Sequence, residues 1–328
     1  MKYESTLNLL QTEIAIKFIK DTFEKELAKA LKLTRVSAPL FVCPETGLND
    51  NLNGYERAVR FDVADIGKDV EIVQSLAKWK RMALAKYGFE AETGLYTDMN
   101  AIRRDETLDA IHSVYVDQWD WEKIITSGDR KLSYLKKTVK SIYKALLKLS
   151  KAVSQKYPQI KNDLPSEITF ISTRQLEKDY PTLSRKERET AVAKKYGAVF
   201  IYQIGWPLAD GKPHDGRAAD YDDWKLNGDI LLWYDVLGIA LEISSMGIRV
   251  DQNSLVKQLK KKKELSKLDN PYCKDIIDGK LPLTIGGGIG QSRLCMYFLK
   301  KAHIGEVQAS IWSDKAIKEN AEKGIYLL

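Results

Sequence analysis

The sequence predicts an α+β fold in which a largely antiparallel β-sheet is flanked by helices. Several stretches repeat apolar residues every three or four positions, which is typical of helices with one buried face. Shorter stretches are rich in β-branched and aromatic residues, and two of them are joined by a tight turn near Asp235 to Gly238. Because neither a low-complexity linker nor an internal repeat divides the 328 residues, we expect one domain over residues 1–328.

The helices follow from the three-to-four period. A helix is expected over residues 7–31, another over 75–88 that is closed by Gly88, and a third over 131–153 with a lysine-rich outer face. A last helix follows Gly290. The inward face of the first helix is formed by Ile16, Ile19, Phe23, Leu27 and Ala30.

The strands include the extended stretch "TRVSAPLFV", in which Pro39 indicates an edge or an interface because proline cannot donate to a central ladder. In the strand expected at 111–122, a period of two separates two faces. One face carries Val114, Val116, Gln118 and Asp120, and the other carries Tyr115, Asp117, Trp119 and Trp121. Further strands are expected at 168–172, 198–204, 228–234 and 239–245.

The composition, 44% apolar and 30% charged, is that of a globular protein. No stretch reaches the about 20 apolar residues of a membrane span, and charges within the N-terminal stretch exclude an ordinary signal peptide. We therefore expect a cytoplasmic protein that binds no membrane. The three cysteines and three histidines are scattered, which predicts neither a disulfide framework nor a metal cluster built on these residues.

The net charge of +7 could indicate binding to nucleic acid. The lysines, however, concentrate on the outer face of the 131–153 helix and in "KQLKKKKELSK" at 257–267. Two interpretations of the second group are open, a solvated helix face and an RNA-binding patch, and the helical pattern favours the first. We expect no nucleic-acid partner.

The glycine-rich stretch "TIGGGIGQSRLC" at 284–295 fits neither common nucleotide motif. No lysine follows Gly290 as a Walker loop requires, and Gln291 occupies the place of the last glycine of a dinucleotide fingerprint. Glycine instead alternates at Gly286, Gly288 and Gly290. Either a ligand site or a sharp bend with close backbone packing would explain this pattern.

Two carboxylates mark the hairpin at 227–250. With its turn near Asp235 to Gly238, Asp229 and Glu242 fall approximately opposite each other on one face. Like charges in that arrangement repel, so a cation should lie between them. Magnesium suits carboxylates that also meet phosphate oxygens; the alternatives are pairing with lysine or exposure to solvent.

A second charged group combines arginines and aspartates with aromatic residues. Arg249 follows the "SSMG" turn, and Arg217 precedes Asp222 within "HDGRAADYDDW". Arginine can grip a carboxylate while aspartate accepts from an ammonium, so the group suits a zwitterion. A flexible acidic loop is the alternative. The stretch "KWKR" at 78–81 is either a solvated helix turn or part of a site, which the place of Trp79 between cations favours; Lys80 is then the residue expected there.

Together these features resemble the catalytic core of class II aminoacyl-tRNA synthetases. Pro39 is similar to the proline of the first class motif, which implies a homodimer. Arg103, followed by "RDE" and the strand "HSVYVDQWDWE", is similar to the second motif, whose arginine grips the α-phosphate of ATP. "GGGIGQSR" is similar to the third, whose arginine, here Arg293, lies against the purine or γ-phosphate end of ATP.

Seven separated motifs are similar, in order, to those of ammonia-dependent asparagine synthetases: "NDNL", "QSLAKWKR", "HSVYVDQWDWE", "DYDDW", "NGDIL", "SSMGIRV" and "TIGGGIGQSR". The resemblance implies that aspartate and ATP form a β-aspartyl adenylate and pyrophosphate, with Mg²⁺ as the metal. Ammonia then attacks to release asparagine and AMP.

The same resemblance implies the site. The catalytic residues would be Arg103, Asp50, Asp120 and Asp222. The amino acid would meet Lys80, Gln118, Arg217, Tyr221 and Arg249. ATP would meet Arg103, His112, Ser244, Ser245, Gly288, Gly290 and Arg293. Magnesium would be held by Asp229 and Glu242.

Two departures qualify the resemblance. The broad class carries a glutamate just before the third-motif arginine, where this chain has Ser292, and the link from Trp224 to Asn227 is short for the family. Two alternative functions therefore stay open at this point. They are an aspartyl- or asparaginyl-tRNA synthetase-like core and a non-catalytic RNA-binding relative, and the retained ATP residues argue against the second.

Overall fold

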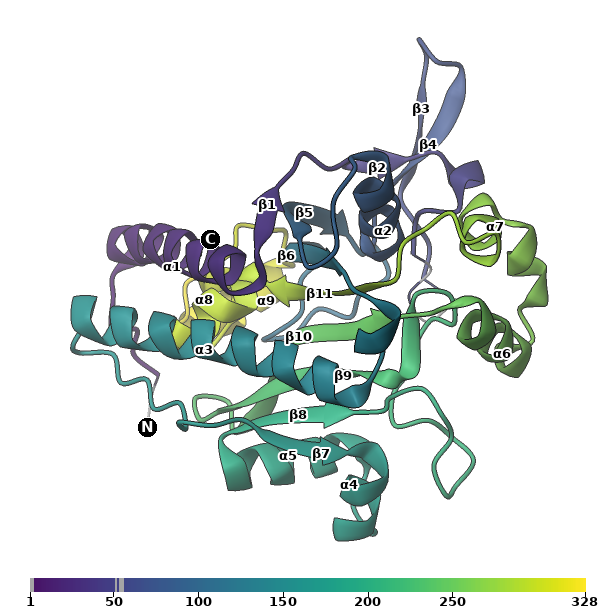
Figure 1. Ribbon diagram of the computed structural model, residues 1–328. Coiled ribbons are helices and arrows are strands. Elements are labelled where there is room, and N and C mark those ends of the chain that lie inside the picture. The colour runs from purple at the N-terminus through teal and green to yellow at the C-terminus, as the bar shows by residue number, and fades with distance from the viewer. Residues whose placement is uncertain (1–2, 51, 53–55) are drawn as a thin grey trace.

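A computed structural model describes residues 3–50, 52 and 56–328 (Figure 1). At its centre lies an eight-stranded sheet in the order β1-β5-β6-β11-β10-β9-β8-β7, next to a three-stranded sheet, β2-β4-β3. The strands are β1 (Leu33–Arg35), β2 (Phe41–Val42), β3 (Arg60–Val63), β4 (Lys68–Ile72), β5 (Gly94–Ile102), β6 (Tyr115–Ile124), β7 (Thr169–Ser172), β8 (Ala198–Tyr202), β9 (Asp222–Tyr234), β10 (Ile239–Arg249) and β11 (Thr284–Gly290).

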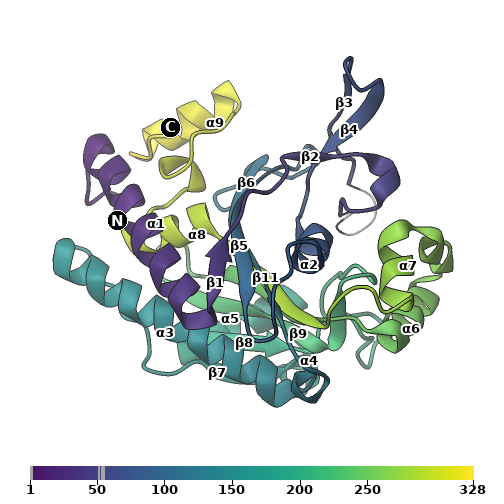
Figure 2. The same ribbon diagram turned by 45° about the horizontal axis from the view of Figure 1, so that its top comes forward.

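The large sheet is mostly antiparallel, as predicted, but mixed at its edges. β1 pairs in parallel with β5, and β7 pairs in parallel with β8. The expected turn joins β9 to β10, where Gly238 adopts a positive φ of 67° that suits glycine. The β3–β4 hairpin projects from the body of the molecule (Figure 2).

Helices cover both faces of the large sheet. They are α1 (Leu9–Leu31), α2 (Ala77–Lys86), α3 (Leu132–Lys156), α4 (Thr173–Asp179), α5 (Arg185–Tyr196), α6 (Gln252–Lys262), α7 (Pro271–Ile277), α8 (Gln291–Leu299) and α9 (Asp314–Glu322). Short 3₁₀ turns occupy Pro44–Thr46, Ser127–Asp129, Leu265–Asp269 and Ile304–Glu306. Within the described chain, none of the helices is both long and apolar enough to cross a membrane.

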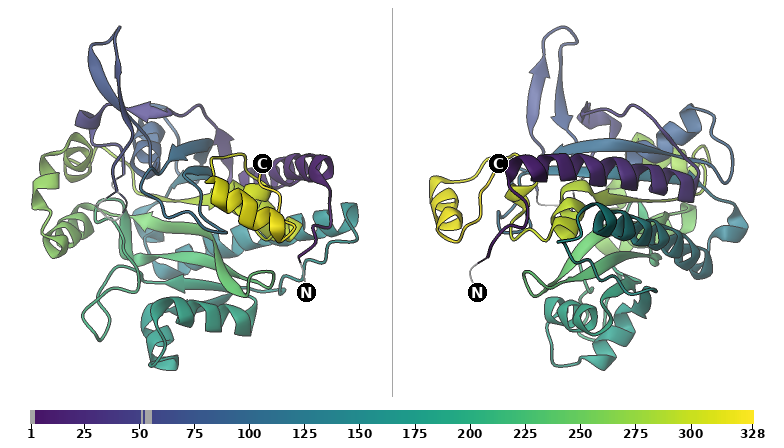
Figure 3. Two further views of the ribbon diagram at one scale, coloured as in Figure 1. Left: turned by 180° about the vertical axis from the view of Figure 1, so that it is seen from behind. Right: turned by 90° about the vertical axis from the view of Figure 1, so that its left-hand side faces the viewer.

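The main core lies where α1, α3 and α8 pack on one face of the sheet, with α1 and α3 side by side (Figures 1 and 3). Phe23 of α1 packs against Trp119 of β6 with ring centroids 5.1 Å apart, and both side chains are fully buried. Trp121 lies in the same core. The face of β6 predicted to carry the two tryptophans therefore does face the core.

The opposite face is covered in two places. Trp79 and Leu84 of α2 pack against Leu95 of β5 at one end. α5 packs against β8, β9 and β10 at the other end. Between α2 and α5, the sheet face of β6, β11 and β10 borders a cavity.

The extended stretch around Pro39 differs from the prediction. It is not one strand: β1 belongs to the large sheet and β2 to the small one, and Pro39 lies between them outside both. The missing N–H of proline is consistent with this break in the ladder. β1 nevertheless lies at the edge of the large sheet, as the proline indicated.

The face of α1 also differs slightly. Ala30 is exposed and Ile16 is only half buried, whereas Thr12 and Leu31 complete the buried line of Ile19, Phe23 and Leu27. The strand expected from residue 111 begins at Tyr115.

Strand β5 was not predicted. Both of its faces are largely buried, so its sequence lacks the alternation that marks a half-exposed strand.

Candidate active site

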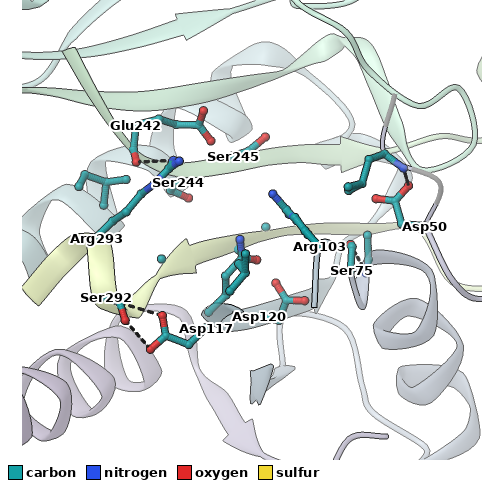
Figure 4. A pocket seen from close by; sticks show the side chains of 18 of the residues that line it. Asp50, Ser75, Arg103, Asp117, Asp120, Glu242, Ser244, Ser245, Ser292 and Arg293 are labelled. Carbon is teal, nitrogen blue, oxygen red and sulfur yellow. Dashed lines mark hydrogen bonds between the residues drawn. The ribbon is translucent and has the colours of Figure 1, made fainter. Parts of the chain in front are cut away.

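The cavity gathers side chains from stretches far apart in the sequence (Figure 4). Most of the predicted site residues line it: Asp50, Lys80, Arg103, His112, Gln118, Asp120, Tyr221, Asp222, Glu242, Ser244, Ser245, Arg249, Gly288, Gly290 and Arg293. Arg217 and Asp229 are not part of this lining but adjoin it through Glu242, whose charge acts on both. Of the "NDNL" motif, Asn51 lies outside the described residues.

Arg249 lines the cavity and is held there by two carboxylates. Its Nε and Nη2 donate to Glu122 Oε1 at 2.9 Å and Oε2 at 2.7 Å, and its Nη1 donates to Asp222. Arg249 is 2% exposed and Glu122 is 0% exposed. Burial acts to raise the pKa of Glu122, but Arg249, together with Lys80 and Thr284, lowers that pKa overall. Two carboxylates therefore fix one guanidinium that borders the cavity.

Glu122 was missed by the sequence reasoning, although the signal was present. The period of two that placed Gln118 and Asp120 on one face of β6 continues to Glu122. The strand thus presents three polar side chains in a row toward the same side of the sheet.

The alternating glycines of β11 make room for that row. β11 pairs with β6 so that Gly286 lies opposite Glu122 and Gly288 opposite Asp120. A Cβ on Gly286 would stand 1.9 Å from Glu122 Oε2, and one on Gly288 would stand 2.2 Å from Gln118 Oε1. Close packing explains these two glycines: the space above them is filled by side chains of β6.

Lys80 and Asp120 form a second buried pair. Lys80 Nζ lies 3.3 Å from Asp120 Oδ1 and donates to the Gly287 carbonyl at 3.0 Å. Burial lowers the pKa of Lys80, with Arg249 adding to the effect and Asp120 opposing it. This end of the cavity therefore has two cationic groups, Lys80 and Arg249. They contact three carboxylates: Asp120, Glu122 and Asp222.

Asp50 completes the acidic side of the cavity. Its Oδ1 accepts from the backbone N–H of Leu52 at 2.9 Å (Figure 4). Burial raises the pKa of Asp50, and the Asp220 carboxylate adds to this although Lys78 opposes it. Burial likewise raises the pKa of Asp222 despite the contact with Arg249. Both carboxylates are therefore stronger bases than exposed aspartates.

Two arginines enter the cavity without an ion pair to any carboxylate of the described residues (Figure 4). Arg103 follows the end of β5, where its backbone N–H donates to Val114 at 2.8 Å, and its guanidinium makes no ion pair with any residue that the structure describes. Arg293, in the first turn of α8, donates from Nη1 to the Glu242 carbonyl at 3.2 Å. Such guanidiniums suit phosphate oxygens.

His112 lies at the rim of the cavity. Its Nδ1 is 2.9 Å from Asp109 Oδ1, and its side chain is 34% exposed. Its place between the loop that follows Arg103 and the start of β6 is compatible with contact to a nucleotide.

The hairpin register differs from the predicted one. Glu242 lies opposite Leu231, a β-bulge follows between Glu242 and Ser244, and Asp229 lies opposite Ser245. The two carboxylates are therefore diagonal neighbours rather than an opposed pair.

A cation does meet Asp229, but it is a guanidinium. Arg217 Nη2 donates to Asp229, and Arg217 Nη1 lies 3.0 Å from Asp215. Burial, reinforced by Glu242 and Asp215, raises the pKa of Asp229 to about 7 against the opposing effect of Arg217. Arg217, expected to grip a substrate carboxylate, is paired with carboxylates of the chain itself.

The same region can still receive magnesium. Asp229 Oδ1 and Ser244 Oγ are buried without a hydrogen-bond partner. In the described part of the chain, no group of three or more histidine, cysteine or acidic side chains could hold a metal alone. Magnesium, however, commonly takes one or two protein carboxylates and completes its shell with phosphate and water. Asp229 and Glu242 fit an ion of that kind.

The cavity also includes residues that the sequence reasoning did not single out as site residues. Ser75 lies at the entry to α2, and Ile304 and Gln308 come from the C-terminal segment. Ser113 Oγ lies 2.8 Å from Ser310 Oγ, and the Ile304 N–H donates to the Ala110 carbonyl at 2.8 Å. These contacts attach the C-terminal segment to the loop beyond Arg103, and nothing in their local sequence marks them.

Comparison with known proteins agrees with this geometry. A family model described as aspartate-ammonia ligase matches residues 10–324. The aspartate–ammonia ligase of Ruminiclostridium cellulolyticum is 59% identical over 327 residues, 99% of this chain and 97% of that protein. The aspartate–ammonia ligase of Fusobacterium nucleatum is 58% identical over the full length of both chains.

The fold is shared more widely. The crystal structure of asparaginyl-tRNA synthetase from Pyrococcus horikoshii, complexed with asparaginyl-adenylate, matches with a TM-score of 0.68 at 18% identity. The match covers 90% of this chain and 68% of that one. The two proteins therefore share a fold over most of this chain, in agreement with the fold expected from the class II resemblance. On the family model and the two relatives of nearly equal length, this chain belongs to the aspartate–ammonia ligase family.

Proposed function

We propose that this aspartate–ammonia ligase makes asparagine through an adenylate. In the first step, a side-chain carboxylate oxygen of aspartate attacks the α-phosphorus of ATP, and the bond to pyrophosphate breaks. In the second, ammonia attacks the activated carbonyl carbon, AMP leaves, and the nitrogen loses a proton. One observation carries the proposal. A single cavity holds two arginines that form no ion pair with the described residues, Arg103 and Arg293, next to a cluster of buried charged residues: Lys80, Arg249, Asp50, Asp120 and Asp222.

Arg103 is the residue proposed to meet the α-phosphate. Negative charge on the phosphoryl oxygens grows as the new bond forms, and a guanidinium already in place stabilises that charge without reorganising. The absence of an ion partner for Arg103 among the described residues supports this role, because the arginine need not first give up a carboxylate. Arg293 would bind the nucleotide from the α8 side.

The aspartate substrate would lie over Lys80 and Arg249. Both cations are nearly fully buried, so their attraction to a carboxylate is weakly screened. Asp50, Asp120 and Asp222 offer acceptors for the substrate ammonium. Because Glu122 and Asp222 hold the Arg249 guanidinium at the cavity lining, its position would be set before the substrate binds.

Asp50 and Asp222 are the proposed acceptors of the proton lost by the attacking nitrogen. Burial raises the pKa of both carboxylates, which makes each a better general base than an exposed aspartate.

Asp229 and Glu242 would hold Mg²⁺ together with phosphate oxygens of ATP. When bound there, the ion would neutralise charge on the departing pyrophosphate. Arg217 would then have to release Asp229, which would free its guanidinium for a substrate carboxylate.

The proposal is tested by supplying aspartate, ATP, Mg²⁺ and a panel of nitrogen donors while AMP, pyrophosphate and asparagine are measured. Ammonium should support equal yields of the three products, and glutamine should not. Arg103→Ala and Asp50→Asn should lose most activity, whereas Asp98→Asn, outside the cavity lining, should keep it. ATP turnover that requires tRNA would overturn the proposal and favour a tRNA synthetase-like activity.

We also propose a homodimer. Leu40 and Phe41, next to Pro39, are 49% and 43% exposed, and the Phe41 ring meets that of Phe61 at 5.3 Å. An exposed apolar group of this kind is typical of an interface. Light scattering at micromolar concentration should give twice the mass of the chain, and a single-chain mass would contradict the proposal.

A further inference from the structure

Asp117 links three distant parts of the chain beside the active site. It lies on β6 between Val116 and Gln118, and it is 6% exposed. Its Oδ1 accepts from the Ser292 N–H at 3.0 Å, and its Oδ2 accepts from Ser292 Oγ at 2.8 Å (Figure 4). Both oxygens of one carboxylate are therefore directed at the beginning of α8.

The first turn of α8 needs such an acceptor. The residue before the helix is Gly290, so within the described chain no side chain at the cap position hydrogen-bonds the free N–H groups. A cap residue normally supplies this bond, and a carboxylate there also interacts favourably with the positive end of the helix dipole. Asp117 supplies the same bond and the same charge from a neighbouring strand.

Two further contacts hold the carboxylate in place. Lys20 Nζ of α1 lies 3.0 Å from Asp117 Oδ2. Burial acts to lower the pKa of Lys20, but the Asp117 carboxylate, together with Cys295 and Tyr115, raises that pKa overall. Gln308 Nε2 donates to Asp117 Oδ1 at 3.3 Å and to Ser292 Oγ at 3.1 Å. Asp117 thus receives hydrogen bonds from α1, α8 and the C-terminal segment at once.

Arg293 is the residue that depends most on this arrangement. It follows Ser292 directly, and among the residues that the structure describes its side chain hydrogen-bonds the Glu242 carbonyl through Nη1 alone. The direction of the guanidinium is therefore set chiefly by where the backbone of the first turn lies. We propose that Asp117 is a positioning residue that fixes the start of α8 and so aims Arg293 at ATP.

The rest of α8 does not need Asp117 in order to form. Leu294, Cys295, Met296 and Phe298 are each 0% exposed and pack in the main core. Most helical stability in proteins comes from such packing rather than from the ends. Loss of the Asp117 charge should therefore loosen the first turn and leave the fold intact.

The experiment compares Asp117→Asn with the purified wild-type protein. Asparagine keeps an acceptor oxygen for the Ser292 N–H but removes the charge that meets Lys20 and the helix dipole. That charge contributes about 1 kcal/mol, so the KM for ATP should rise about fivefold. The KM for aspartate should change less than about twofold. Asp98→Asn is the matched control, because Asp98 accepts at 3.0 Å from the side chain of Gln291, the residue before Ser292, without touching the helix N–H groups.

A double variant separates positioning from general damage. If Asp117 acts through Arg293, then Asp117→Asn should add nothing to the KM for ATP in an Arg293→Ala background. Equal fold-changes in both backgrounds, or an equal rise in the KM for aspartate, would overturn the inference.

The inference rests on the proposed role of Arg293, and the two can fail separately. An unchanged KM for ATP in Arg293→Ala alone would refute that role. A raised KM in Arg293→Ala with no change in Asp117→Asn would refute only the positioning role of Asp117.

Discussion

The substitution Gly286→Ala tests whether the Glu122–Arg249 ion pair organises the amino-acid end of the site. A Cβ at this position would stand 1.9 Å from Glu122 Oε2 and 2.6 Å from Arg249 Nη2. Carbon contacts are normally about 3.5–4.0 Å long. Because Glu122 is 0% and Arg249 2% exposed, neither can move aside into solvent.

The magnitude follows from these contacts. Overpacking a dense interior costs about 1–3 kcal/mol. A hydrogen bond to a charged group contributes a further ~1.5–3 kcal/mol when it is lost. We therefore expect the free energy of unfolding to fall by about 3–5 kcal/mol, the range found when a buried pair is broken. If a third of that loss appears in binding, the KM for aspartate should rise about tenfold.

Two assays measure the two effects. Urea unfolding followed by tryptophan fluorescence gives the stability, and aspartate-dependent exchange of pyrophosphate into ATP gives the KM. Gly128→Ala is the control, since its Cβ would lie 3.7 Å from the nearest neighbour, Thr126 Oγ1. If Gly286→Ala matches this control in both assays, the reasoning about the ion pair is wrong.

Three further predictions concern the metal site, the substrate site and the core. Because burial raises the pKa of Asp229 to about 7, its carboxylate gains a proton as pH falls through that value. The Mg²⁺ requirement should then rise up to about tenfold per pH unit, and Asp229→Asn should remove this dependence. Lys80→Met should raise the KM for aspartate at least about tenfold, because it leaves Asp120 buried without its partner. Phe23→Ala should cost about 3–5 kcal/mol of stability in urea titrations, with both KM values unchanged.

Much of the fold could be predicted from the sequence, because apolar residues recur at regular intervals in the helices and in the strands that have one polar face. The buried stripe of α3 and the two faces of β6 were predicted correctly. The period failed where both faces of an element are buried, as in β5, and the short strands β3 and β4 were not predicted either.

Fewer of the contacts within the site than of the helices and strands could be predicted from the sequence. Motifs located the cavity residues, but the register of the β9–β10 hairpin depends on a bulge that no local pattern marks. Arg217 was expected to meet substrate, yet it pairs with Asp229, a contact between a loop and a strand that spacing alone cannot reveal. Glu122 could have been found by extending the period of Gln118 and Asp120.

The alternation along β6 places two different structural demands on a single strand. Trp119 and Trp121 pack in the core beneath α1 and α3, while Gln118 and Asp120 line the cavity. A substitution on one face should therefore change either the core or the cavity, but not both. A one-residue insertion in the strand would exchange the two sets, placing tryptophan in the cavity and carboxylate in the core. β6 should consequently tolerate changes of residue far better than changes of length.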